Sequence, residues 1–339
     1  MDDRLLSYVC EAVAAKAVDS AELVQTLWSG YGQIVRVGLV DAPVPSVIVK
    51  HVSPPSHAAG HPRGWDTDIS HCRKMRSYEV ERAWYRDWSD RCDPASPCRV
   101  PRCLAVRSDD TGHLLVLEDL DAVGYAGRHH RLTDIGVHAC LGWLASFHAT
   151  FLEDRTDSPS QNARESWHGL WPVGTYWHLA TRPDELAVME NGDLKRAAGR
   201  IDQVLSDARF QTLVHGDAKV ANFCFSLSQR EVAAVDFQYV GGGCGMKDVA
   251  YFLGSCLSEA VLQDRCDDLL DDYFEMLRES LVRSGKSSIW TPLHQEWSDL
   301  FSIGWADFHR FLMGWCPSHA KLTGFSSAMV NQALKAIVR

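Results

Sequence analysis

Several features that would assign this chain to a common protein class are missing from its 339 residues. No apolar run approaches the roughly 20 residues that a membrane-spanning helix needs, and residues 1–11 lack the basic start and apolar core of a signal peptide. Runs of Lys and Arg are absent and the net charge is −10, which argues against a nucleic-acid-binding surface. Neither an internal repeat nor a low-complexity tract is present. We therefore expect a soluble globular protein without a nucleic-acid or membrane partner.

Paired cysteines are missing as well. The eleven cysteines are odd in number and scattered without a Cys-x-x-Cys pair. Free thiols in a reducing cytoplasm fit this pattern better than a disulfide framework. Hydrophobic residues make up 46% of the chain, which suffices for a substantial core. The length predicts two domains.

Histidine is plentiful, but its arrangement does not predict a metal site. Prolines and glycines in residues 51–74 surround His51, His57, His61 and His71. This composition predicts a flexible insertion, which implies no fixed ligand geometry. A bound transition metal is therefore not expected there.

The feature that most constrains function is a run of polar residues beginning at His215. Phosphoryl transfer to a hydroxyl needs a carboxylate that accepts the hydroxyl proton, and oxygen ligands that hold magnesium on the nucleotide. Kinase catalytic loops supply an Asp, a Lys two residues later, an Asn three further on, and a second Asp downstream. This order and spacing are reproduced by Asp217, Lys219, Asn222 and Asp236. The chain is therefore predicted to be a kinase.

The stretch between Asn222 and Asp236 predicts a β-hairpin. Phe223 and Phe225 alternate with other residues, and a turn-rich segment follows them. A hairpin would bring Asn222 and Asp236 side by side, as two ligands of one ion must be. An Asp…Asn…Asp pattern alone also arises from ordinary turn and capping residues, so the hairpin adds weight to the kinase interpretation.

A candidate glycine-rich loop lies in residues 29–37. Gly30 and Gly32 match the first two glycines of the loop that covers the ATP phosphates in kinases, but Val35 stands at the third. An ordinary glycine hairpin is the alternative interpretation.

The next candidate is the lysine that holds the α- and β-phosphates. The β-branched run 46–50 ends in Lys50, as the third strand of kinases ends in its lysine. A helix glutamate should hold this lysine, and a helix predicted over 76–88 offers Glu79 and Glu81. Glu81 is preferred because it lies near the aromatic face of that helix.

Further elements follow from the apolar pattern. Residues 114–120 predict a buried strand that leads into a hinge, where backbone groups would meet the adenine. Asp19, with Glu22 three residues later, predicts a helix start. Apolar residues at three-to-four spacing predict a long helix over 134–151. Thr291-Pro292 predicts the start of another helix.

Together these motifs resemble the kinase-like phosphotransferases of small molecules: aminoglycoside phosphotransferases, choline kinases and, most closely, ecdysteroid kinase-like proteins. The last resemblance rests on Tyr78-x-x-Glu81-x-x-Trp84-Tyr85, His215-Gly216-Asp217, Asp236-Phe237-Gln238 and Asp248-Val249-Ala250. The similarity runs from about Gly30 to Leu253. It implies an α+β, bilobal protein-kinase-like fold, with a small β-rich lobe over residues 1–118 and a larger helical lobe over 119–339.

The resemblance also implies a role for each matching residue. Asp217 would be the catalytic base, with Lys219 contacting phosphate. Magnesium would be held by Asn222 and Asp236. The implied ATP-binding residues are Gly30, Gly32, Lys50, Glu81, Glu118 and Leu120. The implied structural supports of the catalytic loop are His215 and Asp248.

Two departures from protein kinases indicate the kind of acceptor. Gly216 stands where protein kinases carry the Arg that pairs with a phosphorylated activation loop, so that switch cannot operate. Only eleven residues separate Asp236 from Asp248, which leaves little room to dock a peptide. The predicted activity is therefore transfer of the γ-phosphate of ATP to a hydroxyl of a small molecule. A protein-kinase-like regulator and a nucleotide-binding pseudokinase are the alternatives.

Aromatic residues predict the character of the acceptor site. Trp and Tyr residues are frequent in 167–177 and 297–315, which follow or flank the catalytic loop. Aromatic walls suit an acceptor with an apolar or a cationic body and one free hydroxyl. The Asp-Phe-Gln motif favours a bulky apolar alcohol, and core packing is the alternative role for most of the aromatics in 297–315.

Overall fold

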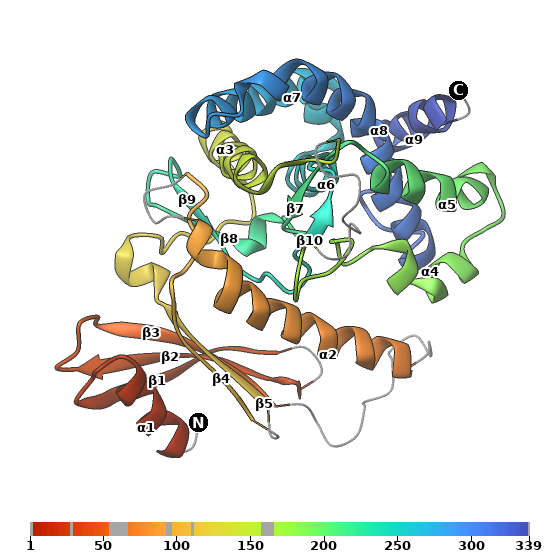
Figure 1. The fold of residues 1–339 in the computed structure, drawn as a ribbon. Coiled ribbons are helices and arrows are strands. Elements are labelled where there is room, and N and C mark those ends of the chain that lie inside the picture. The colour runs from red at the N-terminus through yellow and green to blue at the C-terminus, as the bar shows by residue number, and fades with distance from the viewer. Residues whose placement is uncertain are drawn as a thin grey trace.

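The computed structural model of the chain describes residues 3–27, 30–53, 67–92, 97–109, 112–156 and 166–337 and has two lobes (Figure 1). A five-stranded antiparallel sheet forms the centre of the N-terminal lobe. The C-terminal lobe is mainly helical and carries only short strands. This arrangement confirms the predicted α+β, bilobal fold.

The N-terminal sheet has the strand order β1-β2-β3-β5-β4. Its strands are β1 (Ala17–Thr26), β2 (Gly32–Val40), β3 (Ser46–Val52), β4 (Cys103–Asp109) and β5 (Gly112–Glu118). Side chains on a strand alternate between faces. Val47 and Val49 of β3 accordingly join an apolar cluster with Val9 of α1 (Asp3–Ala12), whereas Ile48 and Lys50 point into the space between the lobes.

The first strand corrects one prediction. The spacing of Asp19 and Glu22 predicts a helix start, but both residues lie in β1, which pairs with β2. The register shifts between Val18 and Ser20, so Asp19 occupies an irregularity of the bulge type. Nearly every residue of β1 is exposed, so the strand lacks the alternating apolar pattern by which strands are recognised. The helix prediction at Asp19 is wrong.

The second helix is longer than predicted. α2 (Thr67–Ala83) begins well before residue 76 and so takes up the last part of the predicted flexible insertion. Its first half lines the space between the lobes with polar side chains, so no apolar stripe marks it as helical. His71 lies on α2 and His51 on β3, whereas His57 and His61 fall outside the described residues. The chain then makes a π-helical turn over 84–88 and a 3-10 turn over 89–91.

The described part of the C-terminal lobe consists of helices and five short strands. The helices are α3 (Asp134–Phe151), α4 (Pro183–Val188), α5 (Asp193–Ser206), α6 (Met246–Cys256), α7 (Glu259–Arg283), α8 (Trp290–Trp315) and α9 (Gly324–Ile337). The strands are β6 (Glu153–Asp154), β7 (Phe210–Val214), β8 (Phe223–Phe225), β9 (Val232–Ala234) and β10 (Gly241–Gly243). The 3-10 turns are Leu120–Val123, Leu179–Thr181, Val220–Asn222 and Ser287–Ile289. β8 and β9 form the hairpin predicted after Asn222.

Two of the predicted helices can be compared with the structure. α3 begins and ends at the predicted residues, and Thr133 caps it by accepting a hydrogen bond from the Gly136 N–H. α8 begins at Trp290, directly after a 3-10 turn, so Thr291 lies inside the helix instead of capping it. None of the described helices is long and apolar enough to cross a membrane. All eleven cysteines are free thiols.

Alanine substitutions at two glycines in helices, Gly314 and Gly199, should have opposite effects on stability. A Cβ at Gly314 of α8 would lie 1.8 Å from the Glu185 carbonyl oxygen of α4, whereas a Cβ at Gly199 of α5 would meet nothing within 4 Å. We expect Gly314→Ala to lower the free energy of unfolding by at least about 2 kcal/mol, because helix α8 must move away from α4. Gly199→Ala should raise it by up to about 1 kcal/mol, because alanine is the better helix former. Urea denaturation of both variants measures this, and equal effects would contradict the close approach.

Candidate functional site

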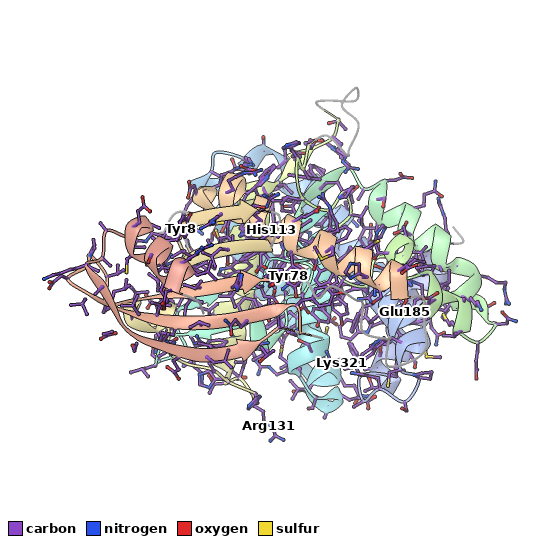
Figure 2. All side chains as sticks on the ribbon, turned by 90° about the horizontal axis from the view of Figure 1, so that it is seen from below. Tyr8, Tyr78, His113, Arg131, Glu185 and Lys321 are labelled. Atoms are coloured by element: carbon purple, nitrogen blue, oxygen red, sulfur yellow. The ribbon has the colours of Figure 1, made fainter. Side chains whose placement is uncertain are left out.

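A cleft with a volume of 760 Å³ lies between the N-terminal sheet, α2 and the segment that contains the predicted catalytic loop. Figure 2 shows Tyr78 of α2 near the middle of the molecule, with Lys321 and Glu185 on the side of the helical lobe. The predicted site residues that line the cleft are Lys50, Glu81, Glu118, Leu120, Asp217, Lys219, Asn222 and Asp236. The fold therefore brings together residues that are far apart in the sequence.

Both carboxylate oxygens of Asp217 make contacts within the cleft. Its Oδ2 lies 2.7 Å from Lys219 Nζ and accepts a hydrogen bond from Asn222 Nδ2 at 3.1 Å. Its Oδ1 accepts a hydrogen bond from the Tyr251 hydroxyl at 3.0 Å. Burial raises the pKa of Asp217 although Lys219 opposes this, and the charge of Asp236 adds to the rise. A raised pKa makes the carboxylate a better proton acceptor than an exposed aspartate.

Asp248 holds the backbone of the catalytic loop in place. It is fully buried at the start of α6, and its two oxygens accept hydrogen bonds from the N–H groups of His215 at 2.6 Å and Gly216 at 3.0 Å. His215 Nε2 lies 3.0 Å from the Val235 carbonyl oxygen, and Nδ1 accepts a hydrogen bond from the Asp217 N–H. The His215 ring therefore links the loop to the β9 side of the hairpin.

The backbone conformation and the close packing at position 216 both favour glycine. The φ angle of Gly216, +78°, lies in the left-handed region that favours glycine. A Cβ there would also lie 2.2 Å from the Tyr239 carbonyl oxygen. The arginine of protein kinases could not adopt this position, which gives a structural reason for the departure seen in the sequence.

Lys50 of β3 forms a buried ion pair with Glu81 of α2. Its Nζ lies 2.6 Å from Glu81 Oε2, and both side chains are almost fully buried. Burial alone would lower the pKa of Lys50, but Glu81 and Asp236 together raise it above its ordinary value. Glu79, the alternative partner, is half-exposed and pairs with Arg76 instead. The structure thus pairs Lys50 with Glu81.

Asn222 and Asp236 lie next to each other at the base of the β8–β9 hairpin. Val235 N–H donates to the Asn222 carbonyl oxygen at 2.9 Å, which fixes the two ends of the hairpin side by side. Asn222 Nδ2 donates to the backbone carbonyl and the carboxylate of Asp217, which leaves its Oδ1 as an acceptor. Asp236 Oδ1 accepts no hydrogen bond from the described residues, and Lys50 Nζ is 3.6 Å away.

The backbone at Asp236 is strained. Its φ angle of +68° is uncommon for a residue with a side chain, and such strain is concentrated at functional sites. Burial opposes ionisation of Asp236, but Lys50, Lys74 and Lys219 hold its pKa below the ordinary value. An ionised carboxylate and an amide oxygen with remaining acceptor capacity are the ligand types that Mg²⁺ prefers. The residues present therefore fit a magnesium ion.

Phe237, between Asp236 and Gln238, packs the π-helical turn that follows α2 against the predicted catalytic loop. Its fully buried ring stacks on Trp84 with centroids 4.4 Å apart and lies 4.7 Å from the His215 ring. The aromatic residues of two predicted motifs thus form one packed unit in the core.

Gly30 and Gly32 lie in the hairpin between β1 and β2, at the edge of the cleft. Gly32 has a φ angle of +138°, and a Cβ there would lie 2.0 Å from the His51 carbonyl oxygen. Neither glycine lines the cleft, whereas Tyr31 between them does. The Tyr31 hydroxyl lies 2.5 Å from His71 Nδ1 of α2, so the hairpin touches the helix across the cleft. Ser29 falls outside the described residues.

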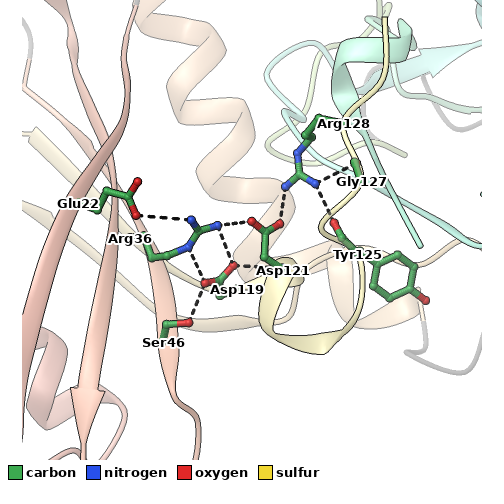
Figure 3. Close-up of polar contacts among 8 residues, drawn as sticks. All are labelled: Glu22, Arg36, Ser46, Asp119, Asp121, Tyr125, Gly127 and Arg128. Carbon is green, nitrogen blue, oxygen red and sulfur yellow. Dashed lines mark hydrogen bonds and ion pairs between the residues drawn. The ribbon is translucent and has the colours of Figure 1, made fainter. Parts of the chain in front are cut away.

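The hinge between the lobes is held by charged residues. The Glu118 carboxylate pairs with Arg99 at 2.5 Å and Arg102 at 3.3 Å, so this side chain anchors the hinge. Figure 3 shows the neighbouring network, in which Arg36 of β2 donates from Nε to Asp119 at 2.8 Å and also pairs with Asp121. Leu120, between these two aspartates, lines the cleft. The hinge is thereby tied to β2.

Two further polar residues of the cleft, Tyr251 and Lys74, were not singled out from the sequence. Tyr251, which donates to Asp217, lies three residues after Asp248 on α6, and helical spacing could have suggested it. Lys74 lies seven residues before Glu81 on α2, and its Nζ donates to Gln238 Oε1 at 2.9 Å. Burial lowers the pKa of Lys74 to about 8. Because the start of α2 was not predicted, this spacing could not be used.

The aromatic residues predicted for the acceptor site divide into two groups. Tyr176 and Trp315 line the cleft, together with Tyr239 and Tyr251, which were not predicted. The residues of the second group are buried in the core and do not line the cleft. They include Trp167, Trp177, Trp297, Phe301, Trp305 and Phe308. Core packing is therefore the role of most aromatics on α8.

Comparison with known proteins agrees with the motifs. The sequence profile of the ecdysteroid kinase-like family matches residues 184–285, which contain the catalytic loop, the hairpin and Asp248. No curated protein matches the chain. The family match and the two-lobed fold confirm the predicted resemblance to kinase-like small-molecule phosphotransferases.

Solved structures of low sequence identity align with nearly the whole chain. A microcompartment-associated aminopropanol kinase is 15% identical, with 99% of this chain and 95% of that chain covered and a TM-score of 0.46. An amicoumacin kinase in complex with AMP-PNP and Ca²⁺ is 13% identical, with coverage of 99% and 93% and a TM-score of 0.49. A choline/ethanolamine kinase family protein from Mesorhizobium loti is 14% identical, with coverage of 94% and 92% and a TM-score of 0.43.

The two glutamates of α2 allow a matched test of the ion pair. We expect Glu81→Gln to lower the free energy of unfolding by about 2–4 kcal/mol, because it leaves the buried Lys50 ammonium without its main counter-charge. Glu79→Gln should cost less than about 1 kcal/mol, because the pair with Arg76 is exposed. Chemical denaturation of the two variants at neutral pH gives the comparison. A Glu79→Gln variant as unstable as Glu81→Gln would refute the assigned pairing.

Proposed function

We propose that this protein is an ATP-dependent phosphotransferase that moves the γ-phosphate to a hydroxyl of a small molecule. The observation that carries the proposal is the convergence of three groups on one cleft. These are the Asp217 carboxylate, the adjacent pair Asn222 and Asp236, and the buried Lys50–Glu81 ion pair. Each group alone could have a purely structural role. Together, in one cleft, they are the groups that phosphoryl transfer requires.

The nucleotide would occupy the side of the cleft next to the sheet and the hinge. Apolar side chains there suit a flat adenine ring, and they come from both lobes: Ile34, Ile48, Leu117, Leu120, Cys224 and Val235. Lys50, held by Glu81, would contact the phosphates as a cation whose position is fixed before the nucleotide binds. Asn222 and Asp236 would hold Mg²⁺, which supplies charge neutralisation for the phosphates.

Asp217 would act on the hydroxyl of the acceptor. Its Oδ1 accepts one hydrogen bond, from Tyr251, and a carboxylate oxygen can accept another. As the acceptor oxygen bonds to the γ-phosphorus, the bond from that phosphorus to the β–γ bridging oxygen breaks and ADP leaves. The hydroxyl proton passes to Asp217. Lys219, 2.7 Å from the other oxygen, would balance the charge that moves during transfer.

The segment after Asp236 supports a small acceptor over a protein substrate. β10 pairs with β7, and a Cβ at Gly241 would lie 2.2 Å from the Trp171 carbonyl oxygen. The segment is therefore packed into the C-terminal lobe and offers no open edge of its own to a peptide. Incubation of the purified protein with labelled ATP and a panel of alcohols, aminoglycosides, sterols and proteins tests the acceptor class. Labelling of proteins alone would overturn the proposal, and no labelling at all would favour a pseudokinase.

Substitutions of Asp217 and Asp236 should have different effects. Asp217→Asn should leave the Kd for magnesium–ATP nearly unchanged and lower turnover by about 10²–10⁴, because it removes only the proton acceptor. Asp236→Ala should weaken nucleotide binding in the presence of magnesium and have little effect without it, because the metal ligand is lost. Calorimetric titration of ATP with and without magnesium measures both. Equal loss of nucleotide affinity in the two variants would rule out separate roles.

A further inference from the structure

The part of the cleft farthest from the hinge carries an unexpected excess of positive charge. We call this part the acceptor end and define it by the cleft-lining residues Ser70, Arg73, Lys74, Tyr176, Arg182, Tyr239, Tyr251 and Trp315. Three of these residues are cationic and none is acidic. The first half of α2 approaches the 3-10 turn before α4 here, as Figure 1 shows.

Arg73 and Arg182 are held next to each other by contacts with the backbone. Arg73 Nη1 donates to the Thr181 carbonyl oxygen at 2.8 Å, and Arg182 Nε donates to the Tyr176 carbonyl oxygen at 2.6 Å. Burial lowers the pKa of Arg73, and the charge of Arg182 lowers it further, as expected for like charges in proximity. Two guanidinium groups are thus fixed on one wall.

Two acidic residues near this pair, Glu185 and Asp184, are not among the described residues that line the cleft. Glu185 is buried and lies 3.1 Å from Arg182 Nη1. Asp184 contributes to the electrostatics of Arg73 but does not line the cleft either. Arg182 Nη2 makes no hydrogen bond to the described residues. The pair therefore keeps donor capacity that the protein itself does not use.

Three of the described carboxylates that line the cleft are paired with basic residues of the protein. Glu118 and Asp119 at the hinge are bound by arginines, and Glu81 is bound by Lys50. The remaining two are the catalytic candidates Asp217 and Asp236. Among the described residues, a cationic acceptor would thus find no carboxylate at the acceptor end except that of the proposed base.

Contacts with aromatic rings connect the arginine pair to the proposed catalytic centre. The Arg182 guanidinium lies 5.9 Å from the centre of the Tyr176 ring, and the Tyr176 and Tyr239 ring centres are also 5.9 Å apart. The ring of Tyr176 also packs at 5.7 Å from that of Tyr251, which donates to Asp217. One small molecule could therefore reach both places.

We propose that the acceptor carries an oxyanion, such as a carboxylate, sulfate or phosphate, which Arg73 and Arg182 bind while its hydroxyl meets Asp217. Planar guanidinium groups with free N–H donors match the geometry of oxyanions. Tyr176, Tyr239 and Trp315 would contact the body of the molecule. This inference rests on the proposed function, and it replaces the apolar or cationic body expected from the sequence with an anionic one.

A series of three alcohols with one ring and one hydroxymethyl group tests the inference. The probes are 4-(hydroxymethyl)benzoate, its primary amide and 4-(aminomethyl)benzyl alcohol, which carry charges of −1, 0 and +1. Calorimetry on the full chain, saturated with magnesium and a non-hydrolysable ATP analogue, measures their Kd values with the phosphate positions filled. The benzoate should bind at least about 10-fold more tightly than the amide, and the amine more weakly still, because only the benzoate gains charge-assisted hydrogen bonds. The corresponding aryl phosphate and sulfate identify which oxyanion binds best.

Three variants separate anion binding from the structural contacts of the arginines. Arg73→Gln and Arg182→Gln should each weaken benzoate binding by about 10- to 100-fold and leave amide binding unchanged. Arg76→Gln is the matched control, because Arg76 also joins α2 to backbone carbonyls, at Gly169 and Leu170, but does not line the cleft. Arg73→Gln leaves the Arg182–Glu185 pair intact, so it remains informative if Arg182→Gln does not fold.

The outcomes distinguish this inference from the proposed function. Equal Kd values for benzoate and amide, tightest binding of the amine, or equal losses for both probes in the arginine variants would each overturn the anionic acceptor. A parallel assay with ATP in place of the analogue measures turnover, and release of ADP with the amide or amine but not with the benzoate would also overturn the anionic acceptor while leaving the kinase proposal intact. Arginine-dependent binding of the benzoate without any ADP release from any probe would support the oxyanion site and count against the kinase proposal.

Discussion

The arrangement of the site depends on the buried ion pair between Lys50 and Glu81. A lysine ammonium that is almost fully buried is stable only with a counter-charge in contact, since the free energy of desolvation would otherwise favour its neutral form. The pair joins β3 to α2, and Asp236 at 3.6 Å extends it to the β8–β9 hairpin. The ion pair therefore fixes the position of α2 on the sheet and the position of the proposed phosphate-binding cation, and the contact with Asp236 connects both to the C-terminal lobe.

A second, separate set of contacts positions the proposed catalytic loop. Asp248 binds two backbone N–H groups of the loop, while Phe237 packs between Trp84 and His215. Hydrogen bonds fix the loop from α6, and aromatic packing fixes it from the π-helical turn that follows α2. The strained backbone of Asp236 is tolerated because these surroundings leave it no alternative conformation. Rigid support of this kind is what a site that works by positioning charged groups requires.

The sequence predicted the site better than it predicted the elements that surround it. Asp217, Asn222 and Asp236 could be assigned to one cleft because kinase-like spacing is set by local geometry, a loop followed by a hairpin. The apolar periodicity of α3 predicted both of its ends, since that helix is buried. β1 and the first half of α2 were missed because the former is exposed and the latter presents polar residues to the cleft. Arg73 and Arg182 were missed because they are far apart in the sequence and only the fold brings them together.

The proposed function requires that Asn222 and Asp236 hold the divalent metal of a nucleotide bound in this cleft. Anomalous diffraction from Mn²⁺ in crystals of the full chain, soaked with manganese and a non-hydrolysable ATP analogue, tests this requirement. We expect an anomalous peak within coordination distance of Asp236 and Asn222, with the nucleotide phosphates between it and Lys50. A peak at another part of the chain, or nucleotide density in the cleft with the metal remote from both side chains, would refute the proposed metal site.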